Sequence, residues 1–543
     1  MRWAQGLRHP LRPSDGALPA SLQGVQQWVR SRSPGTVRRC RREALDRIRV
    51  LARGPHVRQG KGINVSLFRA LLLESAYSDV GAAECCAGAS ISGELGGPAE
   101  WPDFPLSREE QDPLPEADAL REHCAGRAGF LASVRPTEHD RALWASSVED
   151  AAAGKLSGPL WSLDEVVEQV GPDFFVSRRF PVVQGDKVRP CDDFLRSLVN
   201  RMAWCRKKLK LPSVDSFCQL ASSWFAAGRS PTFWKVDHRA AYRQIPLREE
   251  DRKKAVVVFR DPVSSRLCFW IHNALPFGAL GAVYGYNRAA RALVHIARTL
   301  LHIPVDSYYD DFWGVEDGLT AQSSFEAFKE LNVLLGFDLK EEKEQAPSTT
   351  GEILGLEADI SAPQIKVQIS AKRKSKLSRM INGILAEGRL LPGTARKFAG
   401  KLQFACSGVF GKVGRAALQP FYVQSGARRS WVVEVYSGGA RLLYPSARGP
   451  SPLHCAAHSG CPPPACVVYG WQRGGVLGGG VVREGGCPAG GFLPHPGRSV
   501  RPLASPKAAN RSHRAHCGRC GLRNFCCGAT GAGRHFVCRQ PHG

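Results

Sequence analysis

The chain reads VDSYYDDFWGV from Val305 to Val315, an apolar stretch that contains two adjacent carboxylates. Neighbouring side chains of a regular strand point to opposite faces, so Asp310 and Asp311 can serve one site only where the chain turns. We therefore predict that they lie at the tip of a hairpin. Adjacent carboxylates repel each other, and a divalent cation that prefers oxygen ligands, such as Mg²⁺, relieves that repulsion.

Two upstream segments complete the pattern. A two-metal site needs a third carboxylate, and FWKVDHRAAYRQIPL, from Phe233 to Leu247, offers Asp237 at the end of a short apolar run. We expect a strand to give way to a loop at that residue. Between the acidic segments lies LPFGALGA, from Leu275 to Ala282. Its glycines, Gly278 and Gly281, either allow close approach of the backbone to a ligand or simply form a turn.

Three such segments in this order and at this spacing resemble the reverse transcriptases of retrotransposon-type elements. The resemblance identifies Tyr308-Tyr309-Asp310-Asp311 as the YxDD box and Asp237 as the carboxylate of the D-x-x-x-A-Y box. It implies an α+β right-hand polymerase with fingers, a palm made of an antiparallel sheet backed by helices, and a helical thumb. It also implies that Asp237, Asp310 and Asp311 are catalytic and hold two Mg²⁺ ions, or Mn²⁺ in their place.

Basic residues flank a predicted hairpin further upstream. Gln184-Gly185-Asp186 has the composition of a turn between two strands that carry positive charges. The resemblance implies that an arginine and a lysine here hold the phosphates of the incoming nucleotide, and arginine suits this task because its planar fork bonds two phosphate oxygens. The matching residues are Arg189, with one of Arg178, Arg179 and Lys187 in the second role.

The resemblance assigns further contacts with the nucleotide. Tyr242, five residues beyond Asp237, holds the position of the ring that crowds the 2′ carbon of the sugar, and a core tyrosine is the alternative. Phe277 and Gly278 belong to the same nucleotide site. Lys343 resembles the lysine that protonates the leaving pyrophosphate, with Lys340 or a solvated lysine as alternatives.

The remaining elements follow from periodicity and turn residues. Residues 23–77 have helical spacing and many basic residues, whose charges we expect to face water, although binding along a phosphate backbone is the alternative. Residues 78–118 read as a linker or surface loop. Hairpin strands are predicted at 255–259 and 266–271, helices at 284–297, 323–335 and 371–410, and strands at 336–339 and 352–356. The last helical region offers Lys397, Lys401 and Lys412 to a duplex.

Length and charge bound the organisation of the chain. With 543 residues and a formal net charge of +25, the protein suits a polyanionic partner, here an RNA template, a DNA primer and dNTPs. A solvated basic surface is the alternative. The predicted domains are an N-terminal region of unknown role (1–150), fingers (151–230), palm (231–360), thumb or connection (361–430) and a tail rich in Gly, Pro, Arg and Cys (431–543).

Composition also bears on location. No run of eighteen apolar residues occurs, so no membrane span is expected. The first residues lack the apolar core of a signal peptide, so we expect an intracellular protein, nuclear or cytoplasmic, whose 18 cysteines are reduced.

The tail has a different composition. After Glu434 it contains one acidic residue, Glu484, which alone cannot build the metal site of a ribonuclease H domain. We interpret residues from about 435 onward as a shifted reading frame of GC-rich DNA or as disordered chain. The alternative is a zinc site formed by Cys517, Cys520, Cys526, Cys527, His535 and Cys538.

The sequence thus predicts a DNA polymerase, most plausibly RNA-directed, in which residues from about 150 to 430 suffice for primer extension. An RNA-dependent RNA polymerase is an alternative that shares the palm carboxylates, and Tyr242 argues against it. A degenerate element that retains only nucleic-acid binding is the non-enzymatic alternative.

Overall fold

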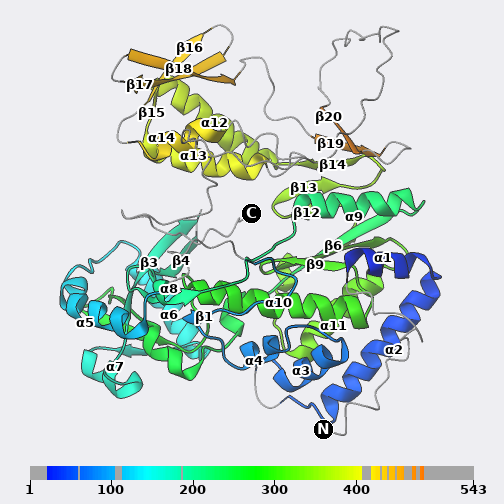
Figure 1. The fold of residues 1–543 in the computed structure, drawn as a ribbon, viewed down its shortest axis with the longest axis horizontal. Coiled ribbons are helices and arrows are strands. Elements are labelled where there is room, and N and C mark those ends of the chain that lie inside the picture. The colour runs from blue at the N-terminus through cyan, green and yellow to red at the C-terminus, as the bar shows by residue number, and fades with distance from the viewer. Residues whose placement is uncertain are drawn as a thin grey trace, which may run out of the picture. The chain divides into compact units, whose positions relative to one another are not determined.

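The structure, a computed structural model, describes residues 21–58, 62–103, 113–184, 187–406 and 418–427, together with five strands between residues 431 and 481. The described residues form helices and several mostly antiparallel sheets, which confirms the predicted α+β class (Figure 1). No helix among them is long and apolar enough to cross a membrane.

The sheet that carries the predicted carboxylates is antiparallel and has the strand order β11-β6-β10-β9. Its residues alternate between two faces, so Trp234 and Val236 enter one core while Phe233 enters another. The strands are β6 (Pro231–Asp237), β9 (Val305–Tyr308), β10 (Asp311–Asp317) and β11 (Gln345–Ser348).

Helices back one face of this sheet, as predicted for the palm. They are α10 (Leu280–Leu300) and α11 (Ala321–Leu335), and both contact its strands (Figure 1). The apolar face predicted for the second helix is confirmed, because Phe325, Phe328, Leu331 and Leu335 are all buried.

The opposite face is covered in part by α9 (Val214–Ala226). Phe217 packs edge-on against Phe233 and Trp313, and Trp224 Nε1 donates a 3.0 Å hydrogen bond to the Val315 carbonyl. These contacts lie towards the ends of β6 and β10 that are remote from Asp237 and Asp311.

A second sheet has the order β2-β8-β7-β3-β4. Gln184 pairs with Lys187 across β3 and β4, which confirms the hairpin predicted around residues 184–186. The hairpin predicted through Asp261 is also confirmed, as antiparallel β7 and β8. The strands are β2 (Leu156–Leu160), β3 (Val176–Gln184), β4 (Lys187–Asp192), β7 (Val256–Arg260) and β8 (Leu267–His272).

The N-terminal helices pack into the same core as the palm helices. Cys86 and Ile91 are buried there and Trp101 is buried in a smaller cluster, so the linker or surface loop predicted for residues 78–118 is wrong where these residues pack into the cores. Residues 104–112 lie outside the described residues. Most charged residues of α2 face water as expected, including the exposed pair Arg39–Glu43, but Arg41 is buried against Glu316. The helices are α1 (Leu22–Arg30), α2 (Pro34–Arg53), α3 (Val65–Glu74) and α4 (Gly81–Ala87).

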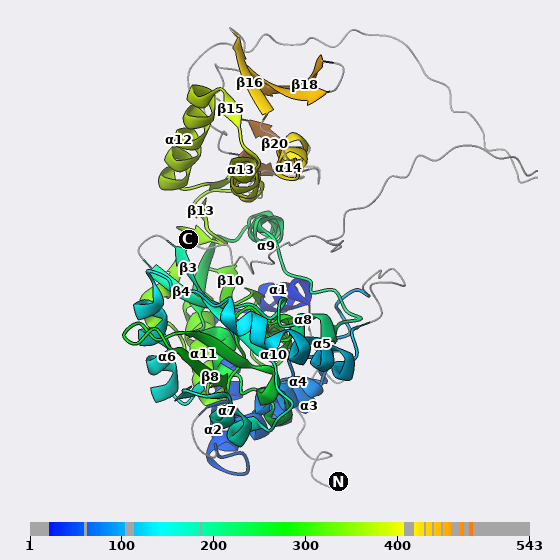
Figure 2. The same ribbon diagram turned by 90° about the vertical axis from the view of Figure 1, so that its left-hand side faces the viewer.

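Two helices connected near Pro392 confirm the helical part of the predicted thumb (Figure 2). The strand predicted at 336–339 is wrong, since only Leu339 forms a bridge there, to His238. The elements are β12 (Thr350–Ile353), β13 (Leu356–Asp359), β14 (Ile365–Gln368), α12 (Ala371–Glu387), β15 (Arg389–Leu390), α13 (Pro392–Ala405) and α14 (Gln419–Ser425).

Several short elements connect these parts, and the tail contains strands. Lys412 and the six candidate zinc ligands lie outside the described residues, as does most of the predicted tail. The connecting elements are β1 (Gly93–Glu94), α5 (Glu116–Ala132), α6 (Asp140–Ala152), α7 (Leu163–Val170), α8 (Val199–Met202), β5 (Ala203–Trp204) and the 3₁₀ helices η2 (Ala241–Gln244), η3 (Glu249–Lys254) and η4 (Glu341–Lys343). The strands beyond residue 430 are β16 (Trp431–Tyr436), β17 (Gly439–Ser446), β18 (Gly449–Ala457), β19 (Val467–Trp471) and β20 (Leu477–Val481).

Candidate active site

The two adjacent carboxylates lie at a hairpin tip, as predicted. Tyr308 pairs with Asp311 across β9 and β10, so Tyr309 and Asp310 form a two-residue turn. Tyr309 adopts a left-handed backbone conformation, with φ 53°. Because the chain reverses here, the side chains of Asp310 and Asp311 are released from strict strand alternation.

Asp237 is the last residue of β6 and lies directly opposite Asp311 in the ladder. Paired residues of antiparallel strands have side chains on the same face. The backbone N–H of His238 also donates a 3.0 Å hydrogen bond to the Asp310 carbonyl, which ties the end of β6 to the turn. The fold therefore brings together three carboxylates that are remote in sequence.

Burial and mutual repulsion disfavour the charged forms of Asp310 and Asp311. Burial, followed by the charge of Asp237, raises the pKa of Asp310 to about 6. Burial raises the pKa of Asp311 to about 7, with Asp310 and Asp237 acting in the same direction and Lys235 opposing them. The Lys343 amine offsets part of the negative charge, since it donates a 2.8 Å hydrogen bond to Asp237 Oδ2.

The donor set fits Mg²⁺ in its chemistry. Carboxylate oxygens are the hard ligands that this ion prefers, and a divalent charge would relieve the repulsion that raises the two pKa values. Within the described ranges, however, no group of three or more His, Cys, Asp or Glu side chains is arranged so that it could hold a metal ion as it stands. One carboxylate oxygen that such a site would use, Oδ2 of Asp237, already accepts a hydrogen bond from the Lys343 amine.

Two of the predicted phosphate-binding residues project from β4. Lys187 and Arg189 are exposed and stand two residues apart, so they share one face of the hairpin. The charge of Arg189 also reaches the site, because it contributes to lowering the pKa of Asp310.

Arg179 does not fit the role suggested by the sequence. It is buried, and its guanidinium donates to both carboxylate oxygens of Asp192 at 2.9 and 3.1 Å and to Ser147 Oγ at 2.8 Å. His272 bonds to the same Asp192 carboxylate. The prediction of a phosphate contact is therefore corrected, because all this hydrogen-bonding capacity is used inside the protein.

Tyr242 lies in η2 and is 2 % exposed. Its ring contacts those of Phe277 and Tyr286, with centroids 5.4 and 5.3 Å away. This placement agrees with the core-tyrosine alternative.

The two glycines of the LPFG region are packed against protein backbone. Gly278 has φ +104°, and a Cβ on it would lie 2.1 Å from the Asp192 carbonyl oxygen. A Cβ on Gly281 would lie 2.4 Å from Ile91 Cα. Asn200 fixes this segment, since its amide donates to the Gly278 carbonyl and accepts from the Leu280 N–H. Close backbone approach is confirmed, but the partner is the protein itself.

Between the two candidate lysines, the structure places the amine of Lys343 at the site. Lys340 reaches Asp237 only through its backbone, whose N–H donates a 2.8 Å bond to the Asp237 carbonyl. Gln244 holds the same loop, because its side-chain amide bonds both the N–H and the carbonyl of Asp338.

Sequence reasoning missed His238, whose buried ring connects the site to both backing helices. Its Nε2 lies 2.8 Å from Asn332 Oδ1, and its Nδ1 lies 3.0 Å from the Tyr286 hydroxyl. Since the Asn332 amide nitrogen donates to the Phe328 carbonyl, its oxygen must accept, and the proton of the ring is on Nε2. Burial lowers the pKa of His238 to about 4, so the ring is neutral. Its spacing gave no signal of this role.

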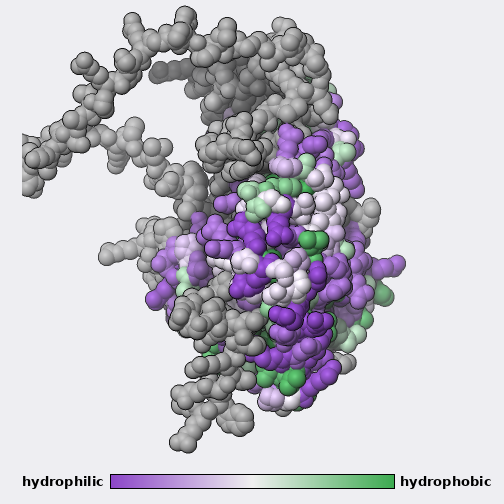
Figure 3. Space-filling model, turned by 90° about the vertical axis from the view of Figure 1, so that its right-hand side faces the viewer, coloured by the Kyte–Doolittle hydropathy of each residue, from purple (hydrophilic) through white to green (hydrophobic). Residues whose placement is uncertain are grey.

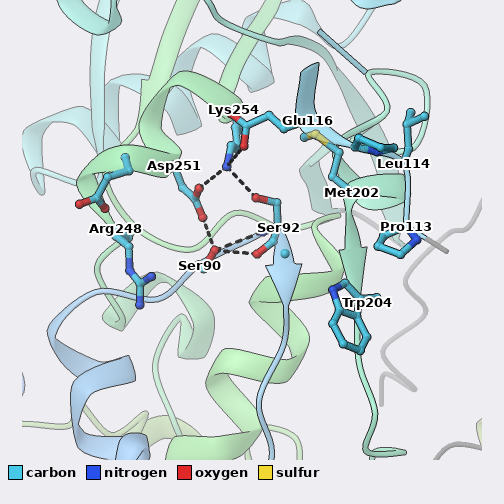
Figure 4. A pocket seen from close by; sticks show the side chains of 13 residues that line it. Ser90, Ser92, Pro113, Leu114, Glu116, Met202, Trp204, Arg248, Asp251 and Lys254 are labelled. Atoms are coloured by element: carbon cyan, nitrogen blue, oxygen red, sulfur yellow. Dashed lines mark hydrogen bonds and ion pairs between the residues drawn. The ribbon is translucent and has the colours of Figure 1, made fainter. Parts of the chain in front are cut away.

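A pocket of about 640 Å³ lies elsewhere, and none of the three carboxylates lines it. Lys254 donates to Asp251, Ser92 and Glu116, while Ser90 donates to Asp251 (Figure 4). These groups form hydrogen bonds and ion pairs with one another. We therefore interpret them as structural contacts that attach the segment before β1 to η3.

Comparisons with known proteins add little. No protein-family model and no curated protein matches the chain. Among solved structures, the foamy viral protease-reverse transcriptase dRH in complex with double-stranded DNA is similar at 12 % sequence identity and a TM-score of 0.35, over 64 % of this chain and 69 % of that chain. A likeness this distant supports no assignment of family or function.

Proposed function

We propose that the protein is a template-directed DNA polymerase of a retroelement, which copies RNA, or DNA, from dNTPs by nucleotidyl transfer. One observation carries this proposal. Asp237 at the end of β6 is paired with Asp311 at the start of β10, beside Asp310 in the turn, and burial together with the neighbouring carboxylates raises the pKa values of Asp310 and Asp311.

Asp237, Asp310 and Asp311 would hold the two Mg²⁺ ions, which when bound supply activation of the primer 3′-hydroxyl and neutralise charge on the triphosphate. Arg189 and Lys187 project from the exposed face of β4 and would bind the triphosphate oxygens. Lys343 would release its hydrogen bond to Asp237 and donate a proton to the departing pyrophosphate. Tyr242, whose ring contacts Phe277, would border the sugar, with Phe277 and Gly278 in the same nucleotide site.

Template choice in this proposal comes from base pairing, so the protein needs backbone contacts and no base readout. The face in Figure 3 is mostly hydrophilic, with hydrophobic residues in scattered patches. Lys397 is exposed on α13 and Lys401 is half-buried there, where they would meet the phosphates of a duplex.

The test is primer extension by the full chain on an RNA template with Mg²⁺. The fragment 150–430 is unsuitable, because residues 44–91 contribute to the main core. Asp310→Asn should lower extension at least roughly a thousandfold. Asp338→Asn removes an exposed carboxylate nearby and should leave extension unchanged. Undiminished extension by Asp310→Asn would refute the site.

The same assay separates the alternatives. Incorporation of ribonucleotides in preference to deoxyribonucleotides would favour an RNA-dependent RNA polymerase. Nucleic-acid binding without any extension, on RNA or on DNA, would favour a degenerate element.

A further inference from the structure

Lys235 shares a face of the sheet with Asp237 and Asp311. It stands two residues before Asp237 on β6, and residues two apart on a strand point to the same side. Its partners across the ladder are Trp313 on β10 and Gln345 on β11. Lys235 is therefore one step along the sheet from the pair formed by Asp237 and Asp311.

This lysine marks a boundary on that face. Phe233, two residues before it on β6, and Trp313, its ladder partner on β10, are fully buried and pack against Phe217 of α9. Lys235 itself remains half-exposed. The covered apolar part of the sheet thus ends at a cation, and the acidic site begins there.

The carboxylates have cations on several sides. Lys343 is bonded to Asp237, and the charge of Arg189 acts on Asp310. The charge of Lys235 acts on Asp311, where it is the largest influence that opposes the rise of that carboxyl's pKa. Within the residues that the structure describes, no hydrogen bond or ion pair within 4.0 Å holds the Lys235 amine.

We propose that Lys235 binds a phosphate oxyanion of the polymerase substrate beside the carboxylates. The inference rests on the proposed function, because it requires a polyanion at this site. A site with three carboxylates repels phosphates, and a half-exposed ammonium next to it supplies the compensating attraction. The phosphate belongs either to the backbone of the primer–template or to the incoming triphosphate.

Two measurements with the full chain distinguish these sources. The first is the affinity for a primer–template, without dNTP, between roughly 50 and 200 mM salt, where each phosphate contact contributes about 0.9 to the slope of log K against log salt. The second is the KM for dNTP in extension. Lys235→Gln removes the charge, Lys235→Arg keeps it, and Lys155→Gln changes a half-buried lysine beside β2 as the matched control.

A backbone contact predicts that Lys235→Gln binds about three- to tenfold more weakly and that its slope falls by about 0.9, while Lys235→Arg and the control keep the wild-type slope. A triphosphate contact predicts an unchanged slope and a KM for dNTP raised about three- to tenfold. Either result supports the proposal, provided that the melting temperature of Lys235→Gln matches wild type.

Unchanged slope and unchanged KM would overturn the inference and leave Lys235 as a charge that balances Asp311. If Lys235→Gln melts at a lower temperature than wild type, Lys235→Arg and Lys235→Met are compared instead. Equal salt slopes and equal KM values in these two variants would also overturn the inference. A wild-type chain that binds nucleic acid but extends no primer would refute the proposed function, while a lower slope in Lys235→Gln would still support the phosphate contact.

Discussion

Gly278 is held more tightly than any sequence pattern suggests. Its left-handed backbone and the Asp192 carbonyl oxygen, which lies 2.1 Å from where a Cβ would stand, both require the absence of a side chain. Asp192 is itself fixed by Arg179 and His272, so the carbonyl cannot retreat without disturbing a buried ion pair.

Gly278→Ala should therefore destabilise the protein by roughly 3 kcal/mol or more, since it combines a strained φ with a clash against backbone. Thermal melting of the full chain measures this loss. Gly383→Ala is the control, because Gly383 lies within α12 with open space around its Cα, and it should raise stability by about 0.5–1 kcal/mol. Equal melting temperatures for Gly278→Ala and wild type would contradict the packing.

Single residues show where sequence reasoning succeeds and where it stops. Asp237 and Asp311 could be predicted because each lies at the end of an apolar run and the order and spacing of their segments are recognisable. Arg179 and Arg189 look alike in the sequence, yet one is buried in an ion pair and the other is exposed. The difference depends on Asp192 and His272, which only the fold brings into contact.

The helix α5 is attached to the start of β3 by a histidine. His123 is buried, and its Nε2 accepts a 2.9 Å hydrogen bond from the Val176 N–H. Burial and, to a smaller extent, the nearby charge of Arg127 lower the pKa of His123 to about 4. The other groups around the ring are aromatic, Phe130 and Phe175.

This attachment should weaken in acid. In the unfolded chain His123 has a pKa near 6.5, whereas in the folded protein it is protonated only at about pH 4. The contribution of this group to stability is therefore complete above about pH 6.5 and is lost as the pH falls towards 4. Between about pH 7 and pH 5 the loss from this group should be about 2 kcal/mol. His123→Gln does not titrate, so the drop in its free energy of unfolding over this interval should be smaller than that of wild type by that amount. Identical pH profiles would exclude the effect.

Elements were predictable where their periodicity was complete. The four apolar residues of α11 recur at helical spacing and are buried as a set. The segment 336–339 looked like a strand, but the side chain of Gln244 bonds Asp338 and replaces a ladder partner. Residues 78–118 are rich in Gly and Pro, yet α4 and Ile91 pack closely against α10, where Gly281 leaves no room for a Cβ.

Across the whole molecule, α2 is joined to the far end of the strand that begins with Asp311. The Arg41 guanidinium bonds Glu316 on β10 at 2.8 and 2.9 Å and also the carbonyls of Leu301, His302 and Thr320. The N-terminal region is thus a structural part of the predicted palm, a role that composition did not reveal because arginine on a helix usually faces solvent.

Removal of this buried charge should be costly. Arg41→Met leaves Glu316 buried without its partner, and we expect a loss of about 3–5 kcal/mol in the free energy of unfolding, measured by urea denaturation. Arg42→Met changes an exposed neighbour and should alter stability by less than about 0.5 kcal/mol. Replacing Glu316 by Met as well should restore part of the loss. A cost below about 1 kcal/mol for Arg41→Met would show that the pair is dispensable.

The strand order of the carboxylate sheet has a mechanical consequence. β6 is flanked by strands on both sides, whereas β9 is at an edge and continues into the turn that carries Asp310. Amide hydrogens of β6 should accordingly exchange more slowly with solvent than those of the β9–β10 turn. When a ligand binds and the spacing of the carboxylates changes, we expect Asp310, in the turn after the edge strand β9, to move. Asp237, at the end of the inner strand β6, should stay in place.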